Sequence, residues 1–501
     1  MRKYISASMA VIIAAASVLT GCSGNKVSNG KPTIKVFMVD RAEAPISNNM
    51  PVIRKLEEKC NINIEFELAP ATDAAERFNL VMASNDVPDI VIYHPDDLIK
   101  YTKAFEPLDE LIGQYTPNLK AIIDSDESIK KDIADVDGHC YILPMISAER
   151  VSQVYFARRD WMEKLGINMP ETTEDFYNML KAFKEKDPNG NGKADEIPFV
   201  TRNKKSGLMP FVEAFGIQEE FFVEDGKVKY GAIDPRMKES LEYLHKLYSE
   251  GLIDKEYLTA DSKEWQAKVT GEQAGCLFDW VSRIDFFNNA IQPDNPKAEF
   301  VAILPPTNGN TPRGLSYQMR KARDDGAAAI SRSSKYKKEI MEMYNYIYSD
   351  EGTLLVNFGI EGEHYSIVDG VPVHNDNIMH SDDGQSAQIN LWKYGINIDW
   401  PCKQDPNHEK QLVSDIANEA RKLYNPFIKD AFPKLRFTDE ERSQINAKMA
   451  DIKTYKDESI DGFITGTKSL NEFDQYVAQL KGMGIEEVLD IYNKALEKYN
   501  K

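Results

Sequence analysis

Alternating apolar and polar residues predict three strands near the start of the chain. The segment 32–40 alternates in a β-rich composition, 62–68 alternates strictly, and 88–93 is a third short apolar run. Helical patterns at 53–60 and 78–83 separate these strands. A strand, helix, strand, helix, strand order implies parallel crossover units, so the expected fold class is α/β.

Longer helices dominate the rest of the chain. Each of them has an apolar stripe at helical spacing, and no internal repeat or low-complexity block interrupts them. This distribution favours two lobes around a cleft. The predicted helices are 173–186, 235–249, 335–349, 439–453 and 486–499.

Composition and charge narrow the possible functions. The chain has 501 residues, of which 42% are hydrophobic and 10% aromatic, so it has enough apolar side chains for large cores and is not a disordered protein. Its 61 Lys and Arg residues against 80 Asp and Glu residues give a formal net charge of −19. An acidic surface repels phosphate backbones, so we expect no nucleic-acid partner.

The N-terminal residues are expected to lie outside the fold. Residues 1–21 join a basic start to an apolar run and a small-residue cleavage site, which is typical of a signal peptide. The run is interrupted by serines and is shorter than the about 20 residues of a spanning helix. Residues 22–31 are polar and predict a flexible tether. The Leu-Thr-Gly-Cys sequence at 19–22 resembles the bacterial lipobox, which implies a lipid on Cys22.

Four cysteines remain after the expected cleavage: Cys60, Cys140, Cys276 and Cys402. They form no CxxC pair, and their wide spacing fits no local metal site. Two disulfides in any of three connectivities are one alternative for an exported chain. We favour buried free thiols, because a chain of this length does not need covalent cross-links to be stable.

The oxygen-rich segment 187–196 predicts a calcium loop. Oxygen side chains at loop positions 1, 3 and 5 with glycine at position 6 match the first half of an EF-hand loop, where hard oxygen ligands surround Ca²⁺. Position 12 is Pro198 rather than glutamate, so a helix-loop-helix sensor is not expected. The alternative is a metal-free Asn-Gly turn. The expected ligands of this structural Ca²⁺ are Asp187, Asn189, Asn191, Lys193 through its carbonyl, Asp195 and Glu196.

Short motifs spread along the chain carry a family resemblance. They accompany the calcium loop and include Phe78-Asn79-Leu80, Phe105-Glu106-Pro107-Leu108, 158–162, 357–365 and Gly482-Met483-Gly484. In these motifs the chain resembles the family 1 extracellular solute-binding lipoproteins, which are substrate receptors of bacterial ABC importers for sugars. The group includes alginate-oligosaccharide-binding proteins. The resemblance extends from the lipobox nearly to the last helix.

This resemblance implies a fold, a ligand and a location. The implied fold is a two-lobed, periplasmic-binding-protein-like fold of type II with crossing segments at its hinge. Hinge closure would capture a carbohydrate, an oligosaccharide, for the permease subunits of an importer. A monomer is expected on the extracellular face of the cytoplasmic membrane, attached through its N-terminal lipid only. We expect the lobes at 32–155 with 317–375 and at 156–316 with 376–501.

Aromatic residues are the first candidates for sugar contacts, because sugars stack their apolar faces on aromatic rings. Trp280 ends a predicted strand that leads into a helix, and open α/β sheets bind ligands beyond the carboxyl ends of their strands. Trp400 and Tyr394 lie in an aromatic stretch without clear helical periodicity, which is typical of a ligand-facing loop. A packed cluster is an equal alternative for that stretch.

Three charged residues are the polar candidates. Asp40 and Arg41 follow the first strand and are placed to reach a hydroxyl or a carboxylate. Arg283 follows Trp280 at the start of the predicted helix. The alternative for isolated charges of this kind is a solvated turn.

We expect no catalytic activity. The sequence contains no nucleophile-elbow, zinc-protease or P-loop motif, and its seven histidines show no helical pairing. A secreted glycoside hydrolase remains an alternative, because its two carboxylates need no local motif. A peptide-binding or adhesion-type lipoprotein is the other alternative, and it would need no hinge.

Overall fold

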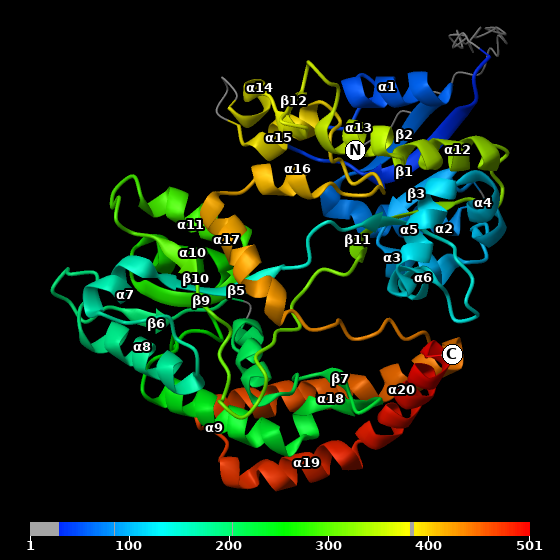
Figure 1. The fold of residues 1–501 in the computed structure, drawn as a ribbon. Helices are drawn as coiled ribbons and strands as arrows, with labels where there is room; N and C mark the ends of the chain where they lie inside the picture. Colours follow the sequence, from blue (N-terminus) through cyan, green and yellow to red (C-terminus); the bar gives the residue numbers. More distant parts are fainter. Residues whose placement is uncertain (1–29, 85, 203, 381–384, 501) are drawn as a thin grey trace, which may run out of the picture.

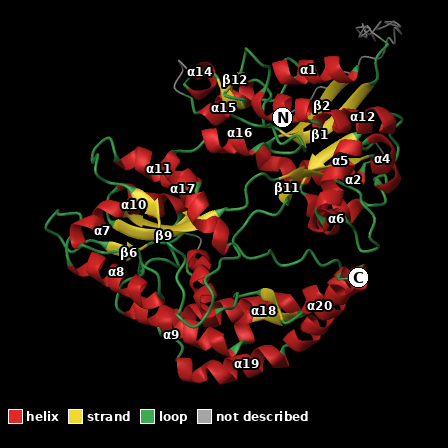
Figure 2. Cartoon of the chain, viewed as in Figure 1, coloured by secondary structure: helices red, strands yellow, loops and turns green. Residues whose placement is uncertain are grey.

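The computed structural model describes residues 30–84, 86–202, 204–380 and 385–500. The expected signal peptide, Cys22 and nearly all of the expected tether lie outside these residues. The described chain forms two lobes, at the upper right and the lower left of Figure 1, which are joined near the centre of the view. Helices surround the sheet of each lobe (Figure 2).

The first lobe is built on a five-stranded sheet in the order β2-β1-β3-β11-β4. Strand β1 pairs in parallel with both β2 and β3, which confirms the predicted crossover units. Strand β11 enters from much later in the chain and runs antiparallel to β3 and β4. The strands are β1 (Thr33–Val39), β2 (Asn63–Ala69), β3 (Ile90–Tyr93), β4 (Leu143–Ile146) and β11 (Ala322–Ile330).

Helices and one hairpin complete the first lobe. Helix α1 begins at Pro51, where the missing N–H is no loss, and it buries Val52, Ile53 and Leu56 against the sheet. The helices are α1 (Pro51–Cys60), α2 (Ala74–Ala83), α3 (Pro95–Leu98), α4 (Asp109–Tyr115), α5 (Pro117–Ser125), α6 (Glu127–Ile133), α12 (Lys337–Ile347), α13 (Asp350–Phe358), α14 (Asp376–Met379), α15 (Ala387–Lys393) and α16 (Pro406–Gln411). The hairpin joins β12 (Tyr365–Val368) to β13 (Val371–His374).

The segment 376–402 belongs to the first lobe, whereas we expected it in the second. Its apolar residues Ile378, Leu391, Ile396 and Ile398 are buried in the same core as the β1–β3 strands. The aromatic stretch within it is also partly helical, since α15 extends to Lys393. The expected boundary at residue 375 came too early, because the return to the second lobe follows only after α16.

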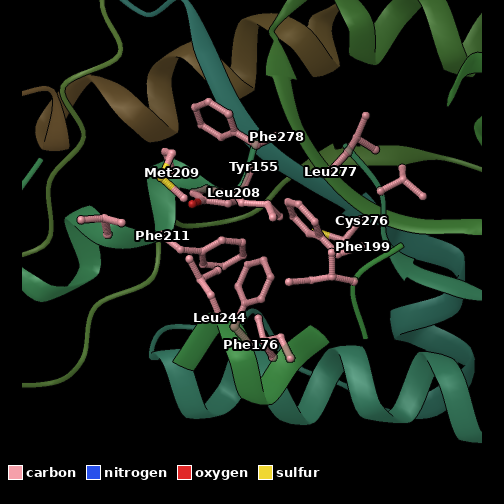
Figure 3. Close-up of a cluster of buried hydrophobic side chains, with 14 of the residues drawn as sticks. Tyr155, Phe176, Phe199, Leu208, Met209, Phe211, Leu244, Cys276, Leu277 and Phe278 are labelled. Carbon is pink, nitrogen blue, oxygen red and sulfur yellow. The ribbon is translucent and has the colours of Figure 1, made fainter. Parts of the chain in front are cut away.

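The second lobe is built on a four-stranded sheet in the order β10-β5-β9-β6. Its core is rich in aromatic residues, and Tyr155, Phe176, Phe199 and Phe211 pack against one another with ring centroids 5.1–6.5 Å apart (Figure 3). The strands are β5 (Gln153–Arg158), β6 (Ile197–Phe199), β9 (Ala274–Trp280) and β10 (Phe300–Ala302), with a separate hairpin of β7 (Phe221–Glu224) and β8 (Lys227–Tyr230).

The helices of the second lobe follow the predicted pattern with one extension. Helix α18 continues to Thr465, well past the predicted end at residue 453. Lys456 and Ser459 lie on its buried face and break the apolar periodicity there. The helices are α7 (Arg159–Leu165), α8 (Thr173–Glu185), α9 (Pro235–Ser249), α10 (Ser262–Thr270), α11 (Ser282–Ile291), α17 (Asp415–Tyr424), α18 (Asp439–Thr465), α19 (Phe473–Gly482) and α20 (Ile485–Tyr499).

Three segments cross between the lobes. The first crossing (147–152) connects β4 to β5, the second (316–321) returns to β11, and the third (412–414) connects α16 to α17. The first two lie side by side, because the Met319 N–H donates to the Arg150 carbonyl and the Ser147 N–H donates to the Lys321 carbonyl, both at 2.8 Å. The lobes are thus connected by a hydrogen-bonded pair of segments and a third, separate crossing.

The described chain has four free thiols and no membrane-spanning helix. Cys140, Cys276 and Cys402 are buried and Cys60 is partly buried, which agrees with the preferred interpretation of the cysteines. Burial raises the pKa of the Cys60, Cys140 and Cys402 thiols to about 12, so they stay protonated at neutral pH. Within the described ranges, every helix is too short or too polar to cross a membrane.

Candidate functional site

Two neighbouring pockets meet at the ring of Trp280. The hinge pocket, of about 320 Å³, is lined by residues from all three crossings and from both lobes. The second-lobe pocket, of about 680 Å³, is also lined by Trp280. The hinge pocket includes Glu149, Ser152, Met319, Arg323, Gln388, Gln404, Glu409, Val413 and Arg421, and the second-lobe pocket includes Gln153, Arg202, Phe278, Asp279, Tyr317 and Lys456.

Trp280 is the exposed tryptophan of this chain. It ends β9, and 42% of its surface is accessible, whereas Trp161, Trp265 and Trp400 are at most 4% exposed and Trp392 is partly buried. The residues before it in β9 are all buried, so the strand fixes the backbone on which the ring stands. A large aromatic ring at a strand end, lining two pockets that also contain polar side chains, is a suitable platform for stacking.

A buried ion pair holds the backbone next to Trp280. The Arg202 Nε and Nη2 atoms donate to the two carboxylate oxygens of Asp279 at 2.7 and 2.8 Å. Asp279 is 3% exposed, and its Oδ1 also accepts the Trp280 backbone N–H at 2.7 Å. Bidentate geometry of this kind adds orientation as well as energy. The Trp280 backbone is therefore held in place without any ligand.

Trp400 does not reach either pocket, in contrast to its expected role as a stacking residue. It is 4% exposed and lies in the first core, where its ring meets Phe66 edge-on at 6.2 Å and Tyr344 at 6.4 Å. These partners come from β2 and α12, far away in the sequence. The aromatic density that suggested a ligand-facing loop therefore reflects core packing, at least for Trp400.

Arg41 and Asp40 follow β1 as expected, but they have different environments. The Asp40 Oδ1 atom accepts the backbone N–H groups of Arg41 and Ile46 at 2.8 and 2.9 Å, so Asp40 stabilises a turn. Arg41 forms an ion pair with Asp399, and its guanidinium lies 4.0 Å from the ring centroid of Trp392. The Arg41 side chain is only 16% exposed, and its Nε atom is buried without a hydrogen-bond partner among the described residues.

Arg283 and Tyr394 are not among the residues that line the two pockets. The Arg283 guanidinium lies over the rings of Phe286 and Trp265, at 4.8 and 5.9 Å from their centroids. The Tyr394 ring packs at 4.5 Å from His364, and its carbonyl accepts the Val52 N–H. Both residues have packing partners in their own lobes.

Most of the polar residues of the hinge pocket were not predicted from the sequence. Arg421 is the clearest case: its Nε and Nη1 atoms are buried and have no hydrogen-bond partner among the described residues. The carboxylates of Glu149 and Glu409 lie 3.6 and 3.9 Å from its guanidinium nitrogens. Arg323 donates from Nε to Asp325 at 2.7 Å. These residues come from the first crossing, β11, α16 and α17, so no local motif connects them.

The segment 187–196 folds as a compact loop of carboxylate and amide oxygens. The carboxylate of Asp187 accepts the N–H groups of Asn191 and Gly192, both at 3.1 Å. The Asn189 and Asn191 side-chain oxygens accept further loop N–H groups, and both side-chain amides donate to Asp195. The loop also contacts the turn before β9, because the Asn189 side-chain amide donates to the Glu272 carbonyl at 3.4 Å.

Glu196 is a buried carboxylate without a partner. It is 9% exposed, and neither carboxylate oxygen has a hydrogen-bond partner among the described residues. Burial raises its pKa, and the nearby carboxylates of Asp187 and Asp195 raise it further. Such a group needs a proton or a cation to compensate its charge, and the oxygen donors around it are of the kind that Ca²⁺ prefers. Within the described residues, this loop included, no three His, Cys, Asp or Glu side chains lie close enough together to form a metal cluster.

Comparison with known proteins identifies the family. The sequence model of one protein family, the bacterial extracellular solute-binding proteins, matches residues 43–354 of this chain. The chain belongs to this family. One relative is the fructooligosaccharide ABC transporter substrate-binding protein FusA of Streptococcus pneumoniae serotype 4. It is 27% identical in sequence, and the alignment covers 99% of this chain and 97% of FusA. Lipoprotein LipO of Bacillus subtilis strain 168 is also 27% identical, over 96% of each chain.

Solved structures agree with the two-lobed architecture. The alginate-binding protein AlgQ2, solved without calcium ion, has a TM-score of 0.72 and 29% sequence identity, covering 93% of this chain and 98% of its own. FusA, solved as an EF-hand mutant in complex with fructo-nystose, has a TM-score of 0.70 and 23% identity, covering 93% and 99%. These likenesses confirm the predicted family and the α/β, two-lobed fold class.

Proposed function

We propose that this protein is the substrate-binding lipoprotein of a bacterial ABC importer and that it captures an oligosaccharide between its two lobes. The observation that carries the proposal is the exposed ring of Trp280, which stands on a pocket shared by both lobes and all three crossings. Relatives named for fructooligosaccharide and alginate binding support a carbohydrate ligand. Membership of a family of transport receptors supports binding without catalysis.

Hinge closure is the mechanism that fits this architecture. The lobes extend over about 32–147 with 322–411 and 151–315 with 415–500, as the two cores divide them. A ligand that contacts both lobes binds the closed arrangement more tightly and so shifts the population toward it. Trp280 contributes from the second lobe, and Gln388 and Gln404 from the first. The permease subunits of the importer would then distinguish the closed form from the open one.

The proposed location is the extracellular face of the cytoplasmic membrane. Cys22 would bear the lipid, and residues 22–31 would separate the lipid from the folded chain. The relative LipO is itself named a lipoprotein. The receptor would act as a monomer, since each chain contains both lobes of its own cleft.

Small-angle scattering combined with a thermal-shift screen tests the proposed function. The mature protein is screened against oligosaccharides of different composition and length. A ligand at 100 times its Kd adds about 2.7 kcal/mol to the unfolding free energy, which raises the midpoint measurably. We expect one class of oligosaccharide to raise the midpoint, to reduce the radius of gyration and to remain uncleaved. Release of reducing ends would instead identify a glycoside hydrolase, and compaction by no sugar would contradict the proposal.

We further propose a structural Ca²⁺ in the loop 187–196, held by the six residues named from the sequence. The unpartnered carboxylate of Glu196 supports this proposal. The ion would neutralise the loop carboxylates and fix the connection between α8 and β6. Since the loop contacts the turn before β9, the ion would stabilise the strand that ends in Trp280. All its ligands are protein oxygens, so its role would be structural rather than catalytic.

Removal of calcium is expected to lower the stability of the wild-type protein. EDTA should lower the unfolding midpoint, and a Ca²⁺ excess of 100 times the Kd should restore about 2.7 kcal/mol. In the variant Glu196→Gln this dependence should be much weaker, and calorimetric titration should show at least about tenfold weaker Ca²⁺ binding. The control is Glu171→Gln, which changes an exposed carboxylate outside the loop. An EDTA response that is the same in wild type and Glu196→Gln would contradict the site.

A further inference from the structure

With one exception, the cations that line the described pockets are already paired with carboxylates of the protein itself. In the hinge pocket, Arg323 pairs with Asp325, and Arg421 lies between Glu149 and Glu409. In the second-lobe pocket, Arg202 pairs with Asp279 and Lys456 with Glu219. Six further lining cations follow the same rule: Lys205 and Lys453 with Asp457, Arg150 with Asp430, Arg320 with Asp132, Lys321 with Asp126, and Lys429 with Glu213.

The last four of these pairs belong to a third pocket, of about 690 Å³, between the first two crossings, segment 429–433 and the end of α20. Over all three pockets, Lys204 is the single lining cation in the described residues for which no carboxylate lies within ion-pair distance. Lys204 lies on the surface of the second lobe in a short 3₁₀ turn, away from the hinge pocket.

Paired cations do not favour an acidic ligand. A carboxylate that enters the cleft meets cations whose charge the protein's own carboxylates already balance. It is either repelled by those carboxylates or must displace one of them, which is then left without a partner. Leaving one member of a partly buried pair uncompensated is strongly unfavourable. A sugar hydroxyl meets no such obstacle, because it donates to carboxylate oxygens that still have free lone pairs and accepts from N–H groups.

Arg421 provides unused hydrogen-bond donors in the hinge pocket. Its Nε and Nη1 atoms are buried and unpartnered, while the Glu149 and Glu409 carboxylates are at distances longer than a hydrogen bond. Together with Gln388 and Gln404, the pocket offers donors and acceptors that are balanced in charge. This composition suits a hydroxyl-rich, uncharged group beside the ring of Trp280.

We propose that the ligand is an uncharged oligosaccharide, and that the internal pairing of the cleft cations, with Asp325 on Arg323 as its main element, excludes uronic acids. This inference rests on the proposed function. Arg421 then acts as a hydroxyl donor to the sugar unit in the hinge pocket, and Asp325 acts as a specificity determinant through Arg323.

Calorimetric titration of the mature wild-type protein tests this inference. The probes are neutral gluco-, galacto- and fructo-trisaccharides and the tri-uronates of mannuronic and galacturonic acid. We expect at least one neutral trisaccharide to bind about tenfold or more tightly than any tri-uronate. Tighter binding of a tri-uronate would overturn this inference and leave the proposed function intact. Binding of neither series would overturn both.

The variant Asp325→Asn tests the mechanism of exclusion. It frees the Arg323 guanidinium, so the ratio of tri-uronate to neutral affinity should rise about tenfold, whereas Asp325→Glu should retain the wild-type ratio. The matched control is Asp124→Asn, which removes the same charge from an exposed pair with Lys120 outside the cleft. An unchanged ratio in a folded Asp325→Asn protein, or an equal rise in the control, would overturn the role of the pair.

Discussion

Replacing Trp280 with alanine should weaken oligosaccharide binding by about 30-fold to 1,000-fold. The loss of a central aromatic platform typically reduces the binding free energy by 2–4 kcal/mol, and each 1.4 kcal/mol is a factor of ten. Trp280 is 42% exposed, so its removal should leave the unfolding free energy nearly unchanged. The measurement is calorimetric titration with the sugar that gives the largest thermal shift, together with a urea melt of each variant.

Two further variants separate stacking from general surface effects. Trp280→Phe keeps an aromatic face and should recover part of the affinity. Phe286→Ala removes another exposed aromatic ring of the second lobe, 43% accessible and outside the pockets, and should bind like wild type. Wild-type affinity in Trp280→Ala would contradict the site, as would an equal loss in Phe286→Ala.

Trp280 and Trp400 explain which parts of the site a sequence can predict. The position of Trp280 follows from local information, namely a buried strand that ends before a helix, and the structure has both β9 and α11 there. The burial of Trp400 depends on Phe66 and Tyr344, which come from β2 and α12. No property of residues 391–401 alone reveals those neighbours. Aromatic density therefore identified a cluster but not its exposure.

The same contrast holds for the fold. Strands β1, β2 and β3 and their parallel pairing follow from periodicity along a short stretch. The lobe to which the segment 376–402 belongs does not follow from periodicity. It depends on where the third crossing takes the chain back to the second lobe. The hinge pocket is the extreme case, since Glu149, Arg323 and Arg421 meet only after the chain has crossed three times. Local patterns define the elements, and only tertiary structure assembles this pocket.

Replacing Lys456 with methionine should destabilise the second lobe by about 3 kcal/mol. Lys456 is 1% exposed on α18, and its Nζ lies 2.8 Å from Glu219 and 3.2 Å from Asp457. Burial alone would raise the pKa of Glu219, but the ammonium groups of Lys456 and Lys205 hold it below its usual range. Removing one partner of such a buried network typically costs about 3–5 kcal/mol, and the remaining pair with Lys205 favours the lower value.

The neighbouring lysine of the same helix provides the control for this prediction. Lys453 pairs with Asp457 at 3.1 Å, but 67% of its side chain is exposed, so Lys453→Met should change the unfolding free energy by less than about 1 kcal/mol. Adding Glu219→Gln to Lys456→Met should recover part of the loss, since it removes a carboxylate that has lost a partner. Urea melts of the four proteins measure these differences. Equal stabilities of the two lysine variants would contradict this prediction. The buried extension of α18 would then be stabilised by its apolar residues Ile460, Phe463 and Ile464 and not by Lys456.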